Sequence, residues 1–361
     1  MKRNIRKVAV LGSGIMGSGI ACQLANVGIE VLLLDIVPKE FENSDNKSKR
    51  NSIVNNALKA SLKSKPSPIY VQSFSKRITT GNFTDDMHKI ADCDWIVEVV
   101  VERLDIKKII FDQVDKFRKE GSLVSSNTSG IPIALMLDDK SEDFKANFLG
   151  THFFNPPRYL KLLEIIPTKF TNIENTEFMM SFGEKILGKT TVLCKDTPAF
   201  IANRVGVYAI QQLFHLVNEL DLTVSEVDFL TGPIMGRPKS ATFRTCDVVG
   251  LDTLVHVANG LKDNCKQDEK HDVFSIPGFI DKMVENNMLG SKTKQGFYKK
   301  SVDENGKKTI LELNLKTFEY QAISRYKYPT ISKAKQTDDI KKRMKILFEG
   351  NDKAGSFYQK V

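Results

Sequence analysis

The chain has 361 residues, of which 41% are hydrophobic and 27% are charged, and this composition excludes a disordered or fibrous protein. Lysine and arginine outnumber aspartate and glutamate by 53 to 44. Because this excess is spread along the chain, it favours a polyanionic ligand over a nucleic-acid-binding arm. The length is typical of two domains.

The five scattered cysteines lack a C-x-x-C pair, so they indicate reduced thiols in a cytoplasmic enzyme rather than zinc or a redox dithiol. The short apolar run near the amino terminus predicts neither a signal peptide nor a membrane span.

A strand, a glycine-rich turn and a helix open the chain. KVAVL (7–11) is a short apolar run, GSGIMG (12–17) follows it as G-x-G-x-x-G, and the next residues have helical spacing up to Gly28. EVLLLD (30–35) predicts a second buried strand, parallel to the first. Such a turn lets a pyrophosphate approach the backbone at a helix N-terminus, and an acid at the end of the second strand binds ribose hydroxyls. A turn chosen only for tight packing is the alternative. The residues predicted to contact the cofactor here are Gly12, Gly14, Ile15, Met16, Gly17 and Asp35. Because Asp35 would repel a 2′-phosphate, the motif favours NAD over NADP.

The alternation of strands and helices continues to about residue 195. Residues 41–68 are rich in Lys, Asn and Ser but keep a thin apolar stripe, which predicts an exposed, basic helical excursion. Residues 94–102 and 122–127 predict further strands, and an amphipathic helix is expected between them at about 105–117. We therefore predict an α/β Rossmann-type domain over residues 1–195, with a mostly parallel sheet.

Residues 147–166 predict an antiparallel pair of strands within this domain. ANFLGTHFF and KLLEII are strand-like, and NPPRYL between them contains too much proline for a helix. Pairing symmetric about Arg158 places His152 opposite Glu164. A carboxylate beside an imidazole fixes its tautomer and stabilises the imidazolium, which suits a general base. The alternative is that His152 ends a strand and Glu164 is a solvated sheet residue.

Two polar segments bear on that choice. SSNTSG (125–130) ends a predicted strand and should lie at the carboxyl edge of the sheet, where open α/β sheets bind ligands. DTPAFIANR begins a region with helical spacing and places Asn203 in an early turn of a helix. Each segment alone is more often a cap or a turn. We predict an all-helical substrate and dimerisation domain over 196–300, and then a lysine-rich segment, 301–361, that is a tail or the start of a further C-terminal region.

In this combination the chain resembles the 3-hydroxyacyl-CoA dehydrogenase family of fatty-acid β-oxidation. The matching segments follow the family's order over residues 8–300 and are VAVLGSGIMGSGIA, DWIVEVVVERLDIKK, SSNTSGIPI, GTHFFNPPRYLKLLEIIP, DTPAFIANR, VVGLDT and KTKQGFYKK. The particular residues found in these segments are most similar to those of the dehydrogenase part of the long bacterial type, which is fused to an enoyl-CoA hydratase segment. Beyond residue 300 the resemblance is weaker.

The resemblance implies a role for each matching residue. It implies that His152 is the catalytic base, that Glu164 is its partner, and that the reacting oxygen is held by Ser129 and Asn203. It also implies that Glu102 and Lys107 contact both the cofactor and the substrate. Asn127 and Lys292 are expected to contact the cofactor alone. One departure is Ala199, where the family usually has Gly, and it bears on the geometry at the start of the helical region.

The expected reaction is the NAD-dependent oxidation of a (3S)-3-hydroxyacyl-CoA to a 3-ketoacyl-CoA. Basic residues in 47–65 are candidates for binding the CoA phosphates, with a solvated helix face as the alternative. We expect either a homodimer through the helical domain or continuation into a hydratase segment, and no nucleic-acid or membrane partner. Alternative functions are a short-chain 3-hydroxybutyryl-CoA dehydrogenase and an inactive NAD-binding relative. The HFFNP segment argues against a dehydrogenase of small hydroxy acids.

Overall fold

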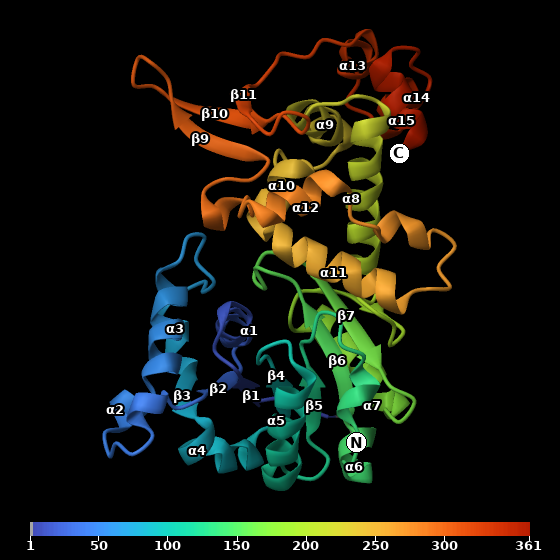
Figure 1. The fold of residues 1–361 in the computed structure, drawn as a ribbon. Coiled ribbons are helices and arrows are strands. Elements are labelled where there is room, and N and C mark those ends of the chain that lie inside the picture. The colour runs from blue at the N-terminus through green and yellow to red at the C-terminus, as the bar shows by residue number, and fades with distance from the viewer. Residues whose placement is uncertain (1–2) are drawn as a thin grey trace. The chain divides into compact units, whose positions relative to one another are not determined.

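The computed structural model describes residues 3–361, and the chain forms two compact units. Unit 1 ends at Ile201, and unit 2 is Ala202–Val361 (Figure 1). No helix in residues 3–361 is long and apolar enough to cross a membrane. The five cysteines are free and buried, as predicted for reduced thiols.

Unit 1 is built on an eight-stranded sheet with the order β3-β2-β1-β4-β5-β6-β7-β8. The strands are β1 (Lys7–Leu11), β2 (Glu30–Asp35), β3 (Ile78–Asn82), β4 (Trp95–Glu98), β5 (Leu123–Ser126), β6 (Phe148–Phe153), β7 (Leu162–Pro167) and β8 (Thr190–Leu193). The six strands from β3 to β6 in this order are parallel to one another, β7 runs antiparallel to β6, and β8 is parallel to β7. The strand order reverses between β1 and β4, the place where open α/β sheets bind ligands.

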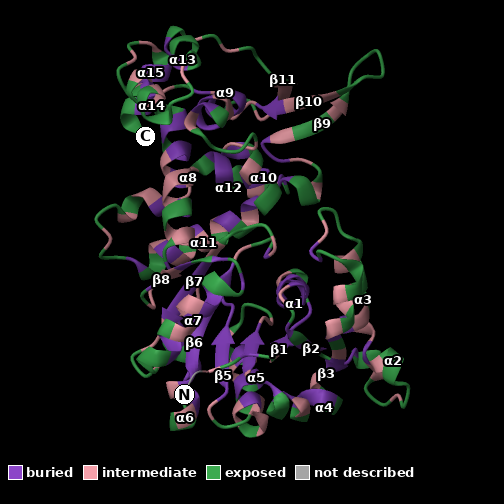
Figure 2. Ribbon diagram, turned by 180° about the vertical axis from the view of Figure 1, so that it is seen from behind, coloured by how far each residue is buried: buried purple, intermediate pink, exposed green. Residues whose placement is uncertain are grey.

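Helices cover both faces of this sheet. They are α1 (Ile15–Asn26), α2 (Lys47–Arg50), α3 (Ser52–Lys63), α4 (Phe83–Asp86), α5 (Leu104–Phe117), α6 (Glu142–Ala146) and α7 (Ile173–Lys185). Successive side chains of a strand point to opposite faces. Val8 and Val10 pack in one cluster with apolar residues of α1, α3 and α7, whereas Ala9 and Leu11 pack in the other with α5 and α6. Figure 2 accordingly shows the central strands buried and the outer sides of the helices exposed. The basic excursion predicted for 41–68 contains α2 and α3.

Unit 2 combines helices with a small antiparallel sheet. Its helices are α8 (Ala202–Glu219), α9 (Val224–Thr231), α10 (Phe243–Val249), α11 (Leu251–Asn264), α12 (Gly278–Glu285), α13 (Pro329–Ala334), α14 (Ile340–Phe348) and α15 (Lys353–Lys360). Its strands are β9 (Tyr298–Val302), β10 (Lys308–Leu313) and β11 (Tyr320–Ala322). Phe214, Phe243, Phe279 and Phe297 pack against one another and join α8, α10 and α12 to the residue before β9. These aromatic contacts form the centre of the unit's core.

Residues 301–361 are part of unit 2 and pack against α9. The Tyr326 hydroxyl lies 2.8 Å from the Ser225 hydroxyl, and Tyr358 donates a 2.6 Å hydrogen bond to the Leu230 carbonyl. Tyr328 also donates to the buried carboxylate of Glu226. The segment predicted as a tail therefore forms β10, β11 and α13 to α15, which are bound to the helical region through tyrosine hydroxyls.

The predicted fold class is confirmed: a mostly parallel Rossmann-type sheet with an antiparallel pair of strands precedes a helical unit. The sequence analysis predicted only helices for the second domain, whereas the structure also contains strands β9 to β11 in unit 2. The structure separates its two units at 201/202, whereas the sequence analysis places domain limits at 195 and 300.

Candidate active site

His152 and Glu164 form a buried pair on neighbouring strands. The register of β6 and β7 sets His152 opposite Glu164, as the hairpin symmetry predicts. The His152 Nδ1 atom lies 2.6 Å from Glu164 Oε2, and the two residues are 4% and 0% exposed. Because an ionised carboxylate only accepts hydrogen bonds, Nδ1 carries the proton and Nε2 of the neutral ring is left as an acceptor. The aromatic rings of Phe154 and Phe200 lie beside the imidazole, with centroids 4.4 and 5.7 Å away.

The second oxygen of Glu164 is also held. Its Oε1 atom accepts a 3.0 Å hydrogen bond from the Ile201 backbone N–H. Burial, together with the charge of the Glu164 carboxylate, raises the pKa of the Cys194 thiol to about 12. Cys194 is therefore a protonated thiol at neutral pH and not a nucleophile. The arrangement fixes the Glu164 carboxylate toward His152.

The glycine-rich turn follows β1 and leads into α1. A Cβ atom at Gly12 would lie 2.6 Å from the Val99 carbonyl oxygen, and one at Gly17 would lie 1.9 Å from the Gly12 carbonyl oxygen. Gly12 also has φ +106°, which favours glycine. At Gly14, by contrast, a Cβ would meet nothing within 4 Å. Gly12 and Gly17 are thus required by packing, and the Gly14 backbone faces open space at the helix N-terminus.

Asp35 connects the end of β2 to this turn. Its Oδ2 atom accepts hydrogen bonds from the Ser13 backbone N–H at 2.6 Å and from the Ser13 hydroxyl at 2.5 Å. Its Oδ1 atom accepts from the Ile36 N–H at 2.7 Å. The carboxylate is half-buried and keeps lone pairs for a further donor. Asp35 therefore fixes the shape of the turn and can also accept hydrogen bonds from ribose hydroxyls.

A pocket of about 730 Å³ lies at the carboxyl ends of β1, β2, β4 and β5. Its polar and turn residues are Gly12, Ser13, Gly14, Ile15, Met16, Asp35, Glu102, Arg103, Asn127 and Ser129. Apolar side chains complete the wall, among them Ile36, Phe83, Ile106 and Ile110. Gly17 and Lys107 are not part of the lining. An acid for a ribose, an open backbone at a helix N-terminus for phosphates and an apolar wall for a base fit a dinucleotide such as NAD.

Glu98, Glu102 and Lys107 form a charge network next to this pocket, and Glu102 is part of its lining. Lys107 is 1% exposed, and its Nζ atom lies 2.8 and 3.0 Å from the two oxygens of Glu98 and 3.2 Å from Glu102 Oε2. Burial raises the pKa of Glu98, against the effect of Lys107. Burial also acts to raise the pKa of Glu102, but Lys107 and hydrogen bonds from Thr128 and Ser129 outweigh it, and the pKa is lowered. Lys107 therefore pairs with two carboxylates in this structure.

Asn127 and Ser129 lie on the turn after β5. Asn127 is buried, and its Oδ1 atom accepts a 2.9 Å hydrogen bond from the Phe153 N–H, the residue after His152. Ser129 is exposed, and its backbone N–H donates to Glu102 Oε1 at 2.8 Å. Asn127 thus joins the end of β5 to the strand that carries His152, and both residues line the pocket.

Two predicted site residues belong to unit 2. Asn203 lies in the first turn of α8. Lys292 lies in a turn before β9, and its ammonium pairs with the carboxylate of Asp252 on α11. Ala199, which precedes α8 in unit 1, has φ +58°. This left-handed conformation costs an alanine about 1–2 kcal/mol, which is why the glycine usual in the family suits the position.

Asp247 holds the Lys292 turn in place. Its two carboxylate oxygens accept hydrogen bonds from the N–H groups of Phe297 and Tyr298 at 2.8 and 2.9 Å. A Cβ at Gly290 would lie 2.3 Å from the Asp247 carbonyl oxygen, and one at Gly296 would lie 2.1 Å from Oδ1. Burial, helped by the nearby Asp228 carboxylate, raises the pKa of Asp247 to about 6, although its backbone hydrogen bonds and Arg244 oppose the shift.

We expect the stability of unit 2 to increase as the pH falls from 7.5 to 5. The pKa of Asp247 is higher in the folded chain than its ordinary value of 3.8, so the folded state binds the proton more tightly than the unfolded state. The Asp247 carboxylate therefore costs folding free energy above pH 6, on the order of 2–3 kcal/mol. Urea unfolding at pH 5, 6 and 7.5 measures this dependence. Far-UV circular dichroism is the suitable signal because Trp95, the single tryptophan, lies in unit 1.

Asp247→Asn should remove most of the pH dependence, whatever its effect on absolute stability. Asp252→Asn is the matched control, because the hydrogen bond from Lys292 lowers the pKa of Asp252 and places its titration below this pH range. A pH dependence that survives in Asp247→Asn would show that another group causes it.

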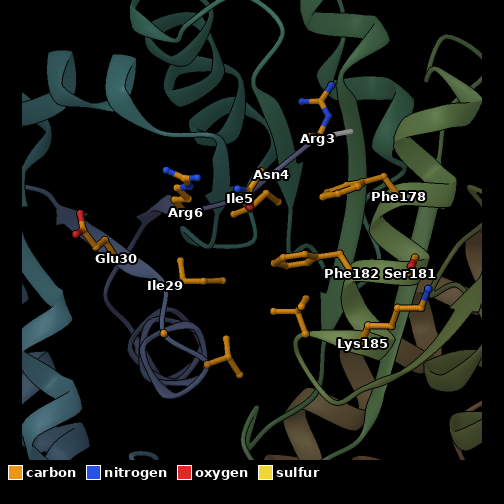
Figure 3. Close-up of a pocket in the computed structure, with 13 residues that line it drawn as sticks. Arg3, Asn4, Ile5, Arg6, Ile29, Glu30, Phe178, Ser181, Phe182 and Lys185 are labelled. Atoms are coloured by element: carbon orange, nitrogen blue, oxygen red, sulfur yellow. The ribbon is translucent and has the colours of Figure 1, made fainter. Parts of the chain in front are cut away.

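A second pocket in unit 1, of about 720 Å³, lies at the start of β1 and β2. Figure 3 shows Phe178 and Phe182 of α7 on one side of it, with Ile5 and Ile29 on the other. None of the predicted site residues lines it. It is therefore not part of the candidate active site.

The sequence analysis did not identify Ser13, Glu98 and Ser126, which shape the site in unit 1, or Asp247, which holds the Lys292 turn in unit 2. Each acts through a partner distant in sequence or through backbone N–H groups, so a linear motif does not show it. The one available signal was the spacing of Glu98, Glu102 and Lys107, which places one charged residue at the end of an apolar strand and two after it.

Comparisons with known proteins agree with this geometry. Residues 7–197 match the model of the NAD binding domain of 3-hydroxyacyl-CoA dehydrogenase, and residues 200–300 match the model of its C-terminal domain. A probable 3-hydroxyacyl-CoA dehydrogenase of Bacillus subtilis is 51% identical over 363 residues, which cover 98% of this chain and 45% of that relative. A putative fatty acid oxidation complex trifunctional enzyme of Rickettsia prowazekii is 36% identical over 326 residues, which cover 90% of this chain and 44% of that relative. The chain thus spans less than half the length of these two relatives.

A solved structure shows the same fold. The (S)-3-hydroxybutyryl-CoA dehydrogenase of Ralstonia eutropha superimposes with a TM-score of 0.64 and 26% identity, covering 81% of this chain and 98% of that chain. The two domain models follow each other in order along the chain, and the NAD-binding one contains the turn, the acid and the pocket described above. The chain belongs to the 3-hydroxyacyl-CoA dehydrogenase family.

Proposed function

We propose that the chain oxidises (3S)-3-hydroxyacyl-CoA to 3-ketoacyl-CoA with NAD, as a step of fatty-acid β-oxidation, with His152 as general base and Glu164 as its partner. The observation that carries the proposal is the buried His152–Glu164 pair, 2.6 Å apart, in the same unit as a dinucleotide pocket. The name of the Rickettsia relative supports the pathway, since it refers to fatty acid oxidation.

NAD would be held by the residues of the pocket. Asp35 would accept hydrogen bonds from the ribose hydroxyls, and the backbone at Gly14 and Ile15 would meet the pyrophosphate. When bound, NAD supplies the acceptor for the hydride that leaves C3 of the substrate. Asn127, Glu102 and Ser129 line the same pocket and are further candidate contacts from unit 1. The family resemblance adds Lys107 and, from unit 2, Lys292.

His152 would remove the proton of the substrate hydroxyl. Its Nδ1–H is donated to Glu164, so Nε2 is free to accept that proton. Glu164 would then stabilise the imidazolium, and its position is fixed by the bond from the Ile201 N–H. Such general base catalysis contributes about 10²–10⁴-fold. The family resemblance supports Ser129 and Asn203 as the groups that hydrogen-bond the developing carbonyl oxygen.

Basic residues in 47–65 are our candidates for the CoA phosphates. On α3 and just after it, Lys59, Lys63 and Lys65 are exposed, whereas Arg50 is engaged in a two-pronged pair with Asp85. Replacing these three lysines by Ala should raise the KM for an acyl-CoA and leave the KM for the matching acyl-pantetheine unchanged. Equal effects on both substrates would reject the idea and leave a solvated helix face.

The assembly of the whole protein is a separate proposal. We propose a homodimer through the helical unit or, since the Rickettsia relative is a trifunctional enzyme, continuation into a hydratase segment. Light scattering that gives a monomer at micromolar concentration would contradict the dimer. A cytoplasmic location stays a prediction from the free cysteines, and fractionation of the native cell would test it.

The experiment that tests the function is NADH oxidation by the purified chain with acetoacetyl-CoA and with a long-chain 3-ketoacyl-CoA. We expect turnover with NADH and much less with NADPH, because the Asp35 carboxylate would repel a 2′-phosphate. The ratio between the two substrates decides between a short-chain 3-hydroxybutyryl-CoA dehydrogenase and a long-chain enzyme. NADH binding without turnover of either substrate would contradict the proposal and indicate an inactive relative.

A further inference from the structure

We propose that Glu98 is a positioning residue that holds the catalytic turn Ser126–Ser129 in its working geometry. It acts through two partners, Lys107 and Ser126. The inference rests on the proposed function in one respect, namely that the Ser129 hydroxyl contacts the reacting oxygen. The positioning itself is a property of unit 1 and can be measured without turnover.

Glu98 is the last residue of β4 and is 0% exposed. Its Oε1 atom accepts from the Val100 N–H at 2.7 Å and from Lys107 at 2.8 Å. Its Oε2 atom accepts from Lys107 at 3.0 Å and from the Ser126 hydroxyl. The Glu98 carbonyl accepts a further 2.8 Å bond from the Asn127 N–H. One buried side chain is therefore bonded to the end of its own strand, to α5 and to the end of the neighbouring strand β5.

Lys107 extends this connection to the other end of the turn. Its ammonium also pairs with Glu102, and Glu102 Oε1 accepts from the Thr128 hydroxyl at 2.6 Å and from the Ser129 N–H at 2.8 Å. Glu98 thus fixes the turn at Ser126, while Glu102 fixes it at Thr128 and Ser129. The shared ammonium of Lys107 sets the spacing between the two carboxylates.

A charged group is required at this position for a physical reason. A buried ammonium must be neutralised, and Glu98 is its fully buried partner, whereas the Glu102 side chain is 40% exposed. A Gln at position 98 would keep the size of the side chain but would remove the charge and one acceptor. Lys107 would then be drawn toward Glu102 alone, and the turn would lose its attachment at Ser126.

Hydrogen exchange of the turn measures the positioning directly. The N–H groups of Ser129 and Ile131 are bonded to the Glu102 carboxylate and the Thr128 hydroxyl, so their exchange reports the order of the turn. In Glu98→Gln we expect exchange at these two amides to be about tenfold faster than in the wild type. Asp112→Asn is the matched control, because Asp112 lies on α5, the helix that carries Lys107, and like Glu98 it pairs with a buried lysine, here Lys140, but has no bond to the turn. Unchanged exchange in a folded Glu98→Gln chain would overturn the proposal.

A double-mutant cycle separates positioning from a general loss of stability. With a 3-ketoacyl-CoA and NADH, Glu98→Gln should lower kcat by about 10²-fold, because a displacement of about 1 Å has that effect. The change in KM should be smaller. In the Ser129→Ala background the same replacement should change kcat by less than about twofold, because the group being positioned is already absent. Independent, additive losses would overturn the proposal.

Two further results keep the test decisive. If Glu98→Gln does not fold, Ser126→Ala removes the bond between the Glu98 side chain and the turn, together with the 3.2 Å bond from the Thr128 N–H to the Ser126 hydroxyl, and leaves the ion pair intact. It should also accelerate exchange at Ser129 and Ile131, and unchanged exchange would overturn the proposal. If the wild-type chain turns over no 3-ketoacyl-CoA, the proposed function fails, and the exchange measurements alone decide on Glu98.

Discussion

Replacement of His152 by Gln is expected to lower kcat by about 10³-fold while NADH still binds. Gln has no group that can accept the hydroxyl proton, so the step assigned to Nε2 is lost. Its amide can still donate to Glu164 Oε2, and therefore the buried carboxylate keeps a partner, which Ala would not provide. Initial rates of NADH oxidation with acetoacetyl-CoA, together with the dissociation constant of NADH from its fluorescence, measure both effects. The His152 pair does not line the dinucleotide pocket, which is why binding should survive.

His152→Ala is the companion variant and should be equally inactive but less stable, because it leaves Glu164 without the imidazole in a buried position. Thermal unfolding of both variants separates loss of the base from loss of the fold. Activity within a few-fold of the wild type in either folded variant would show that His152 is not the base.

The two strands of the first βαβ unit were predictable to the residue, whereas its helix, expected up to Gly28, ends at Asn26, and several later elements were not predicted. β1 and β2 match the predicted 7–11 and 30–35 because each is a short apolar run bounded by turn residues. β3 (ITTGN) and β8 (TTVL) have no such run, and both are edge strands of the sheet. The predicted strand over 94–102 ends at Glu98 although the apolar letters continue, because Glu98 turns inward to Lys107. Tertiary contacts, which a local pattern does not contain, decided these limits.

The C-terminal segment shows the same limitation. Residues 301–361 have weak apolar periodicity because α13 to α15 are short and several of their neighbouring contacts are polar. Tyr326, Tyr328 and Tyr358 attach the segment to α9 through their hydroxyls. Such attachments depend on residues about a hundred positions away, and no sequence pattern indicates them.

The candidate site was predictable where symmetry or a motif determined it. The symmetry of the hairpin about Arg158 gave the His152–Glu164 register, and the strand–turn–helix context gave the relation of Asp35 to the turn. For Lys107, only the resemblance gave a role, as a contact to cofactor and substrate. The structure shows its ammonium between Glu98 and Glu102, and the contact to cofactor and substrate stays a prediction. The contact between Lys107 and Glu98 could not be predicted from the sequence, because it depends on how β4 and α5 bring two residues nine positions apart together.

Replacement of Glu164 by Gln is expected to lower kcat by about 10³–10⁴-fold without loss of NADH binding, and it tests the pair itself. In the wild type the carboxylate can only accept, so the proton is on Nδ1 and Nε2 is the acceptor. A Gln whose oxygen keeps the bond from the Ile201 N–H turns its NH₂ group toward Nδ1. Nδ1 then becomes the acceptor, the proton moves to Nε2, and the imidazole can no longer receive the substrate proton. A comparable exchange of carboxylate for amide in a serine protease triad costs about 10⁴-fold for this reason.

The measurement is kcat for NADH oxidation and for the reverse reaction from pH 6 to 9, with NADH binding measured in parallel. Glu184→Gln is the matched control. Glu184 is another carboxylate of unit 1, and it accepts a hydrogen bond from the Thr191 hydroxyl but has no contact with His152. It should retain the wild-type rate. If Glu164→Gln behaved like the wild type across this range, the tautomer of His152 would not depend on Glu164, and a base held by its ring contacts with Phe154 and Phe200 would replace the pair.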